Sequence, residues 1–116
     1  MCHVLVIEDE WLLAEYISEI VSEAGATSIE TTDNQDGAVA AASVHKPDVI
    51  VSDVRLVSGT GPRAVQAIHA AYGAIPVIFI TSSPDECKPC APPGIVLGKP
   101  INERLVANAF RRIAPR

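Results

Sequence analysis

The chain has 116 residues, of which 48% are hydrophobic and 20% are charged, and its net charge is -5. This size suits one domain with a substantial core, and the composition excludes a disordered chain. The acidic balance argues against nucleic acid as the main partner, because phosphate backbones are bound by clustered Lys and Arg, and no apolar stretch is long enough to span a bilayer. The amino terminus lacks the basic region of a secretory signal, and three cysteines are too few for a disulfide framework. We therefore expect a cytoplasmic protein.

The first half of the chain alternates between predicted strands and helices. An apolar strand over residues 4–7 precedes a helix over residues 10–24, which Gly25 can end in a left-handed conformation. A weaker strand follows at 27–32, and Asp33 or Asn34 can cap an alanine-rich helix that ends before Pro47. The apolar residues of the first helix share one face: they are Leu13, Ile17, Ile20, Val21 and Ala24.

The second half repeats this alternation with one irregular segment. An apolar strand at 49–52 precedes a helix with Pro62 in its first turn and Gly73 at its end, and further strands are predicted at 77–80 and 95–98. Between the last two strands there are four prolines in ten residues, which leaves room for one helical turn at most. The helix expected there should be short, distorted or missing. Asn102 can cap a final helix, and its buried stripe is expected to consist of Leu105, Val106, Ala109, Phe110 and Ile113.

Five strands that alternate with helices predict an α/β fold with a doubly wound parallel sheet. Continuous apolar strands are typical of sheets that crossover helices bury on both faces. A reversal of strand order near the first strand would open a crevice at the carboxyl ends of the first and third strands. The residues that follow the strands are therefore the candidates for function.

Three carboxylates, a hydroxyl and an ammonium group lie at these strand ends, namely Glu8, Asp9, Asp53, Thr81 and Lys99. Hard carboxylate oxygens suit Mg²⁺, which binds a few acids and leaves positions for water and phosphate. Asp53 can then attack a phosphoryl group while Mg²⁺, Lys99 and the Thr81 hydroxyl hold the transferring oxygens. Taken alone, each residue is an ordinary strand-end side chain, so the prediction depends on the set.

These motifs and their order resemble the receiver domain of two-component response regulators over essentially the whole chain. The motifs are VIEDE at 6–10, VSDVRL at 51–56 followed by Gly61, PVIFITS at 76–82, and KP at 99–100. The resemblance implies one receiver domain over residues 1–116 with a flavodoxin-like sheet of strand order 2-1-3-4-5.

The same resemblance implies a role for each site residue. Asp53 is the phosphoacceptor, and Mg²⁺ is held by Glu8, Asp9, Asp53 and the backbone carbonyl of Arg55. Lys99 contacts the phosphoryl group, and its bond to the following proline is expected to be cis. The phosphate donor is a histidine kinase or a histidine phosphotransfer protein, and the output is a downstream protein, with no nucleic acid and no membrane as partner. The domain is a signalling module and not a classical enzyme.

Three features depart from the family pattern. Thr81 corresponds to the switch hydroxyl, but the aromatic residue expected three positions before Lys99 is Val96. Val57 stands where proline is common, which should loosen the loop after Asp53. The proline-rich segment replaces a helix that, in the family, is part of the surface to which partner proteins bind. The chemistry is therefore kept while the signalling residues are altered.

Several alternatives remain open. The chain could be a phosphorelay intermediate or a phosphate sink, since both need the chemistry but no conformational output. An aspartate-nucleophile phosphatase would carry a second acid where Arg55 stands, and a flavin binder would need phosphate-binding donors in place of the first-loop acids.

Two further features have ordinary structural interpretations. Cys87 and Cys90 have a spacing that suits a redox pair or half a zinc site, but two small side chains in a loop is the simpler interpretation. Trp11 is expected to pack in or near the core, although Trp11, Leu12 and Glu15 are candidates for a kinase-docking surface.

Overall fold

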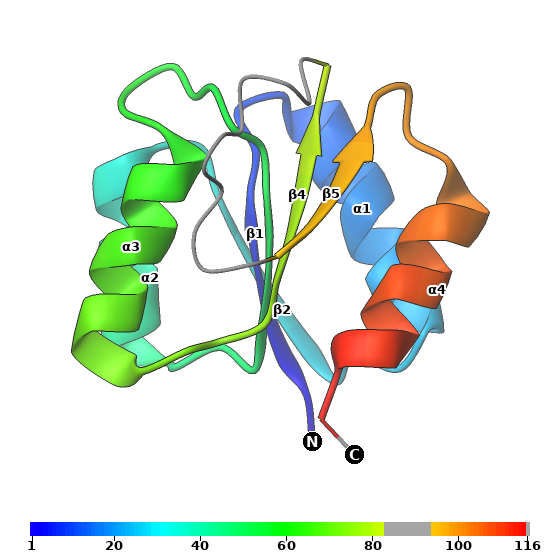
Figure 1. Ribbon diagram of the computed structural model, residues 1–116, viewed down its shortest axis with the longest axis horizontal. Coiled ribbons are helices and arrows are strands. Elements are labelled where there is room, and N and C mark those ends of the chain that lie inside the picture. The colour runs from blue at the N-terminus through cyan, green and yellow to red at the C-terminus, as the bar shows by residue number, and fades with distance from the viewer. Residues whose placement is uncertain (83–93, 116) are drawn as a thin grey trace.

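The computed structural model describes residues 1–82 and 94–115, in which a five-stranded parallel sheet lies between two layers of helices (Figure 1). The strands are β1 (His3–Ile7), β2 (Ser28–Thr32), β3 (Val49–Ser52), β4 (Val77–Thr81) and β5 (Ile95–Gly98). The helices are α1 (Trp11–Glu23), α2 (Gln35–Val44), α3 (Gly61–Tyr72) and α4 (Glu103–Ile113). The strand order β2-β1-β3-β4-β5 confirms the predicted doubly wound, flavodoxin-like fold.

The segment between β4 and β5 is only partly described. The short or missing helix predicted there falls on residues 83–93, which lie outside the described residues, as do Cys87 and Cys90. The label α4 consequently denotes the final helix.

The helix ends follow the signals in the sequence. Gly25 has a φ of 125° after α1, as the prediction requires. Asn34 and Asn102 each accept a hydrogen bond from the backbone N–H three residues on, at the starts of α2 and α4. Thr60 does the same for α3, with Pro62 in the first turn. Each of these caps satisfies a backbone group that the helix itself leaves without a partner.

The sheet is buried on both faces by two hydrophobic cores. Figure 1 shows α1 and α4 on one side of the sheet and α2 and α3 on the other. Along β1, Val4 and Val6 belong to the first core, whereas Leu5 and Ile7 belong to the second. This alternation explains why the central strands are continuous apolar runs and not alternating patterns.

Two burial predictions were wrong. Leu105 is 52% exposed, because the buried stripe of α4 is formed by Val106, Ala109 and Phe110. Successive residues are rotated by about 100° around a helix, so Leu105 points away from the direction of Val106. Trp11 is 71% exposed, because it begins α1 at the edge of the sheet, where the core ends.

The parallel register brings the carboxyl ends of the strands to one edge of the sheet. Ile7 pairs with Thr32 on β2 and with Ser52 on β3, and Thr81 pairs with Gly98 on β5. This edge is at the top of Figure 1, and the marked chain ends are at the bottom. Among the described residues, no helix has the length and apolar character that crossing a membrane requires.

Candidate functional site

Polar side chains are buried at the carboxyl edge of the sheet. In the described part of the chain, five polar or charged residues are buried, and all except His3 lie at or directly after the ends of β1, β3 and β4. These four are Glu8, Ser52, Asp53 and Thr81. Because buried polar groups cost free energy unless they have partners, their concentration at one edge indicates a specialised site.

Lys99 joins two carboxylates that are distant in sequence. Its Nζ lies 3.1 Å from Asp53 Oδ2 and 3.3 Å from Glu8 Oε1. The Lys99 side chain is 18% exposed, and those of Glu8 and Asp53 are 1% and 10% exposed. An ammonium group at this depth partly compensates two negative charges that would otherwise repel each other.

Burial and neighbouring charge change the titration of these groups. Burial is the main reason that the pKa of Glu8 is raised to about 7, and Asp53 and Asp9 raise it further. The Glu10 backbone N–H, which donates to Glu8 Oε2 at 3.1 Å, and Lys99 oppose this shift. Burial would lower the pKa of Lys99, but its hydrogen bond to Asp53 and the charges of both carboxylates outweigh burial, so this pKa is raised.

Asp53 is held in place by hydrogen bonds to backbone groups of β1 and of its own loop. Its N–H donates to the Ile7 carbonyl at 2.8 Å, and its Oδ1 accepts the Val54 N–H at 2.7 Å. The Ser52 hydroxyl donates to the Asp53 carbonyl at 2.7 Å, and a Cβ on Gly61 would overlap both of these oxygens. Ser52 is not among the site residues predicted from the sequence, although a polar residue that ends an apolar strand is a usable signal.

The remaining predicted site residues lie around this cluster. Thr81 is buried at the end of β4, and its carbonyl accepts the Lys99 N–H at 2.9 Å. The Lys99–Pro100 bond is cis, as expected. The Arg55 side chain is exposed, and its backbone pairs with Thr60 in the loop after Asp53.

Val96 lies apart from this cluster, within β5. It pairs with Phe79 in the ladder and is 36% exposed. The position predicted for the switch residue therefore carries a small, partly exposed side chain on an edge strand.

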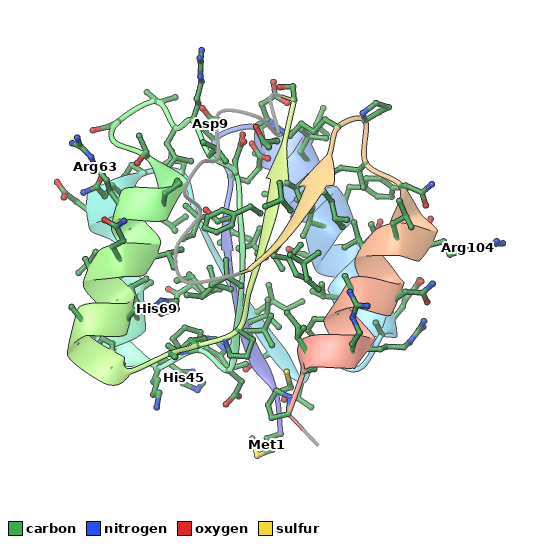
Figure 2. All side chains as sticks on the ribbon, viewed as in Figure 1. Met1, Asp9, His45, Arg63, His69 and Arg104 are labelled. Carbon is green, nitrogen blue, oxygen red and sulfur yellow. The ribbon has the colours of Figure 1, made fainter. Side chains whose placement is uncertain are left out.

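The acids form a group that could hold a metal ion. Carboxylate oxygens of Glu8, Asp9 and Asp53 lie within 4.8 Å of one another. Three hard oxygen donors in this arrangement fit Mg²⁺, which takes a few carboxylates and keeps water in its other positions. Figure 2 shows Asp9 at the top of the molecule, and a groove of about 370 Å³ that it shares with Glu8 also reaches Trp11.

Comparison with known proteins agrees with this geometry. A family model described as the response regulator receiver domain matches residues 4–109. The probable transcriptional regulatory protein TcrX of Mycobacterium tuberculosis is 34% identical over 79 residues, which are 68% of this chain and 33% of TcrX.

Solved structures of similar proteins have the same fold. The chemotaxis protein CheY4 of Vibrio cholerae has a TM-score of 0.85 and 28% identity, over 97% of this chain and 98% of that one. The anti-anti-sigma factor PhyR of Bartonella quintana has a TM-score of 0.81 and 30% identity, over 97% of this chain and 46% of PhyR. The chain spans only 33%, 24% and 37% of the length of three curated relatives.

Proposed function

Since this chain belongs to the response regulator receiver domain family, we propose that Asp53 accepts a phosphoryl group in a Mg²⁺-dependent step and that the result is passed on by protein contacts. The observation that carries the proposal is the double contact of Lys99, with Glu8 at 3.3 Å and Asp53 at 3.1 Å, beside a third carboxylate from Asp9. A nucleophile, donors for a cation and a fixed positive charge are thus adjacent at one sheet edge.

The metal donors in this proposal are Glu8, Asp9, Asp53 and the backbone carbonyl of Arg55. The three carboxylates supply oxygen atoms within 4.8 Å of one another. When Mg²⁺ is bound, it supplies positive charge between the carboxylates and the phosphoryl oxygens. Glu8 has to be ionised to bind it, and its raised pKa of about 7 means that the proton competes with the cation near neutral pH.

The transfer itself requires little of the protein beyond positioning. One Asp53 carboxylate oxygen forms a bond to phosphorus while the bond from phosphorus to the donor imidazole nitrogen breaks, and that nitrogen keeps the electron pair. The Val54 N–H on Oδ1, at 2.7 Å, and Lys99 on Oδ2 fix the carboxylate for this attack. Lys99 keeps its proton because its pKa is raised, so it stabilises the charge on the transferring group.

Phosphorylation would change the electrostatics of this edge. A phosphoryl group adds a charge of about -1.5 to -2 and new acceptor oxygens beside Lys99, which then has to redistribute its contacts. In this account the Thr81 hydroxyl turns toward the new oxygens and the adjoining loops shift between two arrangements.

Beryllofluoride, which mimics a phosphoryl group on aspartate, provides a test in solution. With Mg²⁺ present it should raise the melting temperature of the wild type and of Asp36→Asn, an exposed control on α2, because a ligand that binds the folded state stabilises it. Asp53→Asn should show no rise. An equal rise in Asp53→Asn would contradict the assignment.

A phosphorelay or phosphate-sink function is the second candidate, and Val96 is the observation that favours it. This side chain is small and 36% exposed, so the switch position offers no large ring for Thr81 to draw inward. A relay needs only the transfer chemistry. The two candidates are separated by testing whether the beryllofluoride form binds a non-kinase target more tightly than the free form.

The partners follow from the chemistry. A phosphohistidine on a sensor kinase or phosphotransfer protein is the proposed donor, and the cytoplasm is the proposed location. The proposed output partner is a downstream protein; the similar proteins include a transcriptional regulator, a chemotaxis protein and an anti-anti-sigma factor.

A further inference from the structure

The loop that follows Asp53 is closed on itself. Residues 54–60 leave β3 and return to α3, and the loop is drawn together by an antiparallel bridge between Arg55 and Thr60. The Gly61 N–H also donates to the Val54 carbonyl at 2.8 Å. Gly59, with a φ of 81°, provides the left-handed residue in the turn. The backbone of Arg55 is therefore positioned by whatever holds the far side of this loop.

Gln35, at the start of α2, holds that far side. Its backbone N–H donates to the Ser58 carbonyl at 3.1 Å, and its side-chain Oε1 accepts the Thr60 N–H at 3.1 Å. Between these two bonds lies Gly59, where a Cβ would overlap the Gln35 side chain. Gln35 thus contacts three consecutive residues of the loop. Thr60, the last of them, is 25 positions away from Gln35 in sequence.

Gln35 is itself firmly anchored. It is the first residue of α2, and the preceding Asn34 caps the helix by accepting the Gly37 N–H at 2.7 Å. Ala38 and Ala42 fix the same helix against the sheet, since both are buried in the second core. Gln35 therefore presents its amide from a rigid element, which is the requirement for a residue that positions another group.

The start of the loop is anchored by Val54, which is buried in the second core, and by Leu56, which packs against that core. Val57 stands where the family commonly has proline and is 84% exposed, so it neither restricts the backbone nor packs against the protein. The looser loop expected from Val57 is instead held by two hydrogen bonds from α2. Each such bond contributes about 1 kcal/mol, enough to bias the loop strongly toward one arrangement.

We propose that Gln35 is a positioning residue for the metal site: it holds loop 54–60 and so fixes the backbone of Arg55, whose carbonyl would be a ligand of Mg²⁺. This inference rests on the proposed function, which assigns that carbonyl to Mg²⁺. Gln35 touches neither the cation nor the phosphoryl group, and it acts through Thr60 and the Arg55 bridge.

The experiment measures Mg²⁺ affinity by calorimetry and hydrogen exchange of the Thr60 amide by NMR in the full chain. Gln35→Met keeps the length of the side chain and removes the acceptor. Gln66→Met makes the same change at an exposed position on α3 and serves as the matched control. Gln35→Glu restores an acceptor oxygen for the Thr60 N–H, and thermal unfolding establishes that each variant is folded.

The expected result has two parts. Gln35→Met weakens Mg²⁺ binding about tenfold, at the lower end of the effect of removing a supporting residue around a metal, whereas Gln66→Met binds as the wild type does. The Thr60 amide exchanges faster in Gln35→Met, and Gln35→Glu recovers its protection.

Two different results would contradict the role of Gln35 and the proposed function. Equal Mg²⁺ affinity in Gln35→Met and the wild type overturns the role of Gln35 and leaves the proposed function standing. A wild type that does not bind Mg²⁺ at all overturns both.

Discussion

Ionised Glu8 destabilises the metal-free protein, so replacing it with Gln should stabilise the fold. Burial raises its pKa from 4.5 to about 7, and the neutral form is therefore favoured on folding. A group with a raised pKa contributes stability that is complete below the unfolded value near 4.5 and is lost as the pH rises through about 7. Each pKa unit corresponds to about 1.4 kcal/mol, so the loss above pH 8 is at most about 3.5 kcal/mol.

The expected gain from Glu8→Gln is smaller than this limit. The pKa of about 7 already includes the attraction to Lys99 at 3.3 Å, but the Gln amide does not reproduce every hydrogen bond of the protonated acid, so we expect a net gain of about 1–2 kcal/mol. For a domain of this size that corresponds to a rise in melting temperature of about 4–8 °C.

Thermal unfolding in a chelator at about pH 8 and about pH 5 tests this reasoning, since the two values lie on either side of the raised pKa. Glu8→Gln should melt higher than the wild type at the upper pH, with much of the difference lost at the lower one. Glu15→Gln, an exposed change on α1, should follow the wild type at both. The reasoning is refuted by a gain of the same size at both pH values, or by no gain at the upper one.

Three further changes test other parts of the structure. Lys99→Met leaves two buried carboxylates without their cation and should lower the stability of the metal-free protein by about 2–4 kcal/mol in urea unfolding at about pH 8; unchanged stability would argue against the ion pairs. Gly61→Ala places a Cβ on the Asp53 carbonyl oxygen and should cost about 1–3 kcal/mol, seen as a lower urea midpoint, so an unchanged midpoint would show that this contact is not close. The pKa of His3 is lowered from 6.5 by burial and then by His45, whose ring stacks on it with centroids 3.6 Å apart. Stability from His3 is therefore present above pH 6.5 and lost on acidification, and His3→Gln should lose less than the wild type over that range.

The fold could be predicted from the sequence because its strands and helices have strong local signals. Gly25, Asn34 and Asn102 end or begin helices where they were expected to, through bonds within a few residues. The apolar strands β1, β3 and β4 are buried on both faces, so their pattern is unambiguous. The strand order came from the resemblance to receiver domains, and the ladder confirms it.

Contacts across the fold could not be predicted in this way. Leu105 belongs to an apolar stripe in sequence, yet the orientation of α4 on the sheet leaves it 52% exposed. Trp11 is large and apolar, but it is the first residue of α1 and lies beyond the edge of the core, where it is 71% exposed. The bond between Gln35 and Thr60 depends on how α2 and the loop after β3 approach each other, which no local pattern encodes.

The candidate site falls between these two cases. The residue types that carry the chemistry could be predicted, since Glu8, Asp53 and Lys99 each follow a recognisable strand. The pairing of Lys99 with both acids depends on the parallel register, and the raised pKa of Glu8 depends on its burial. Distances and pKa values therefore required the structure.

The central claim is that Asp53 accepts a phosphoryl group. Incubation with Mg²⁺ and a small phosphodonor, followed by intact-mass and peptide mass spectrometry, tests it most directly. The account predicts one acid-labile phosphate on the peptide that contains Asp53, absent without Mg²⁺ and absent in Asp53→Asn, with Asp36→Asn unaffected. A phosphate that persists in Asp53→Asn, or a wild type that acquires none, would contradict it.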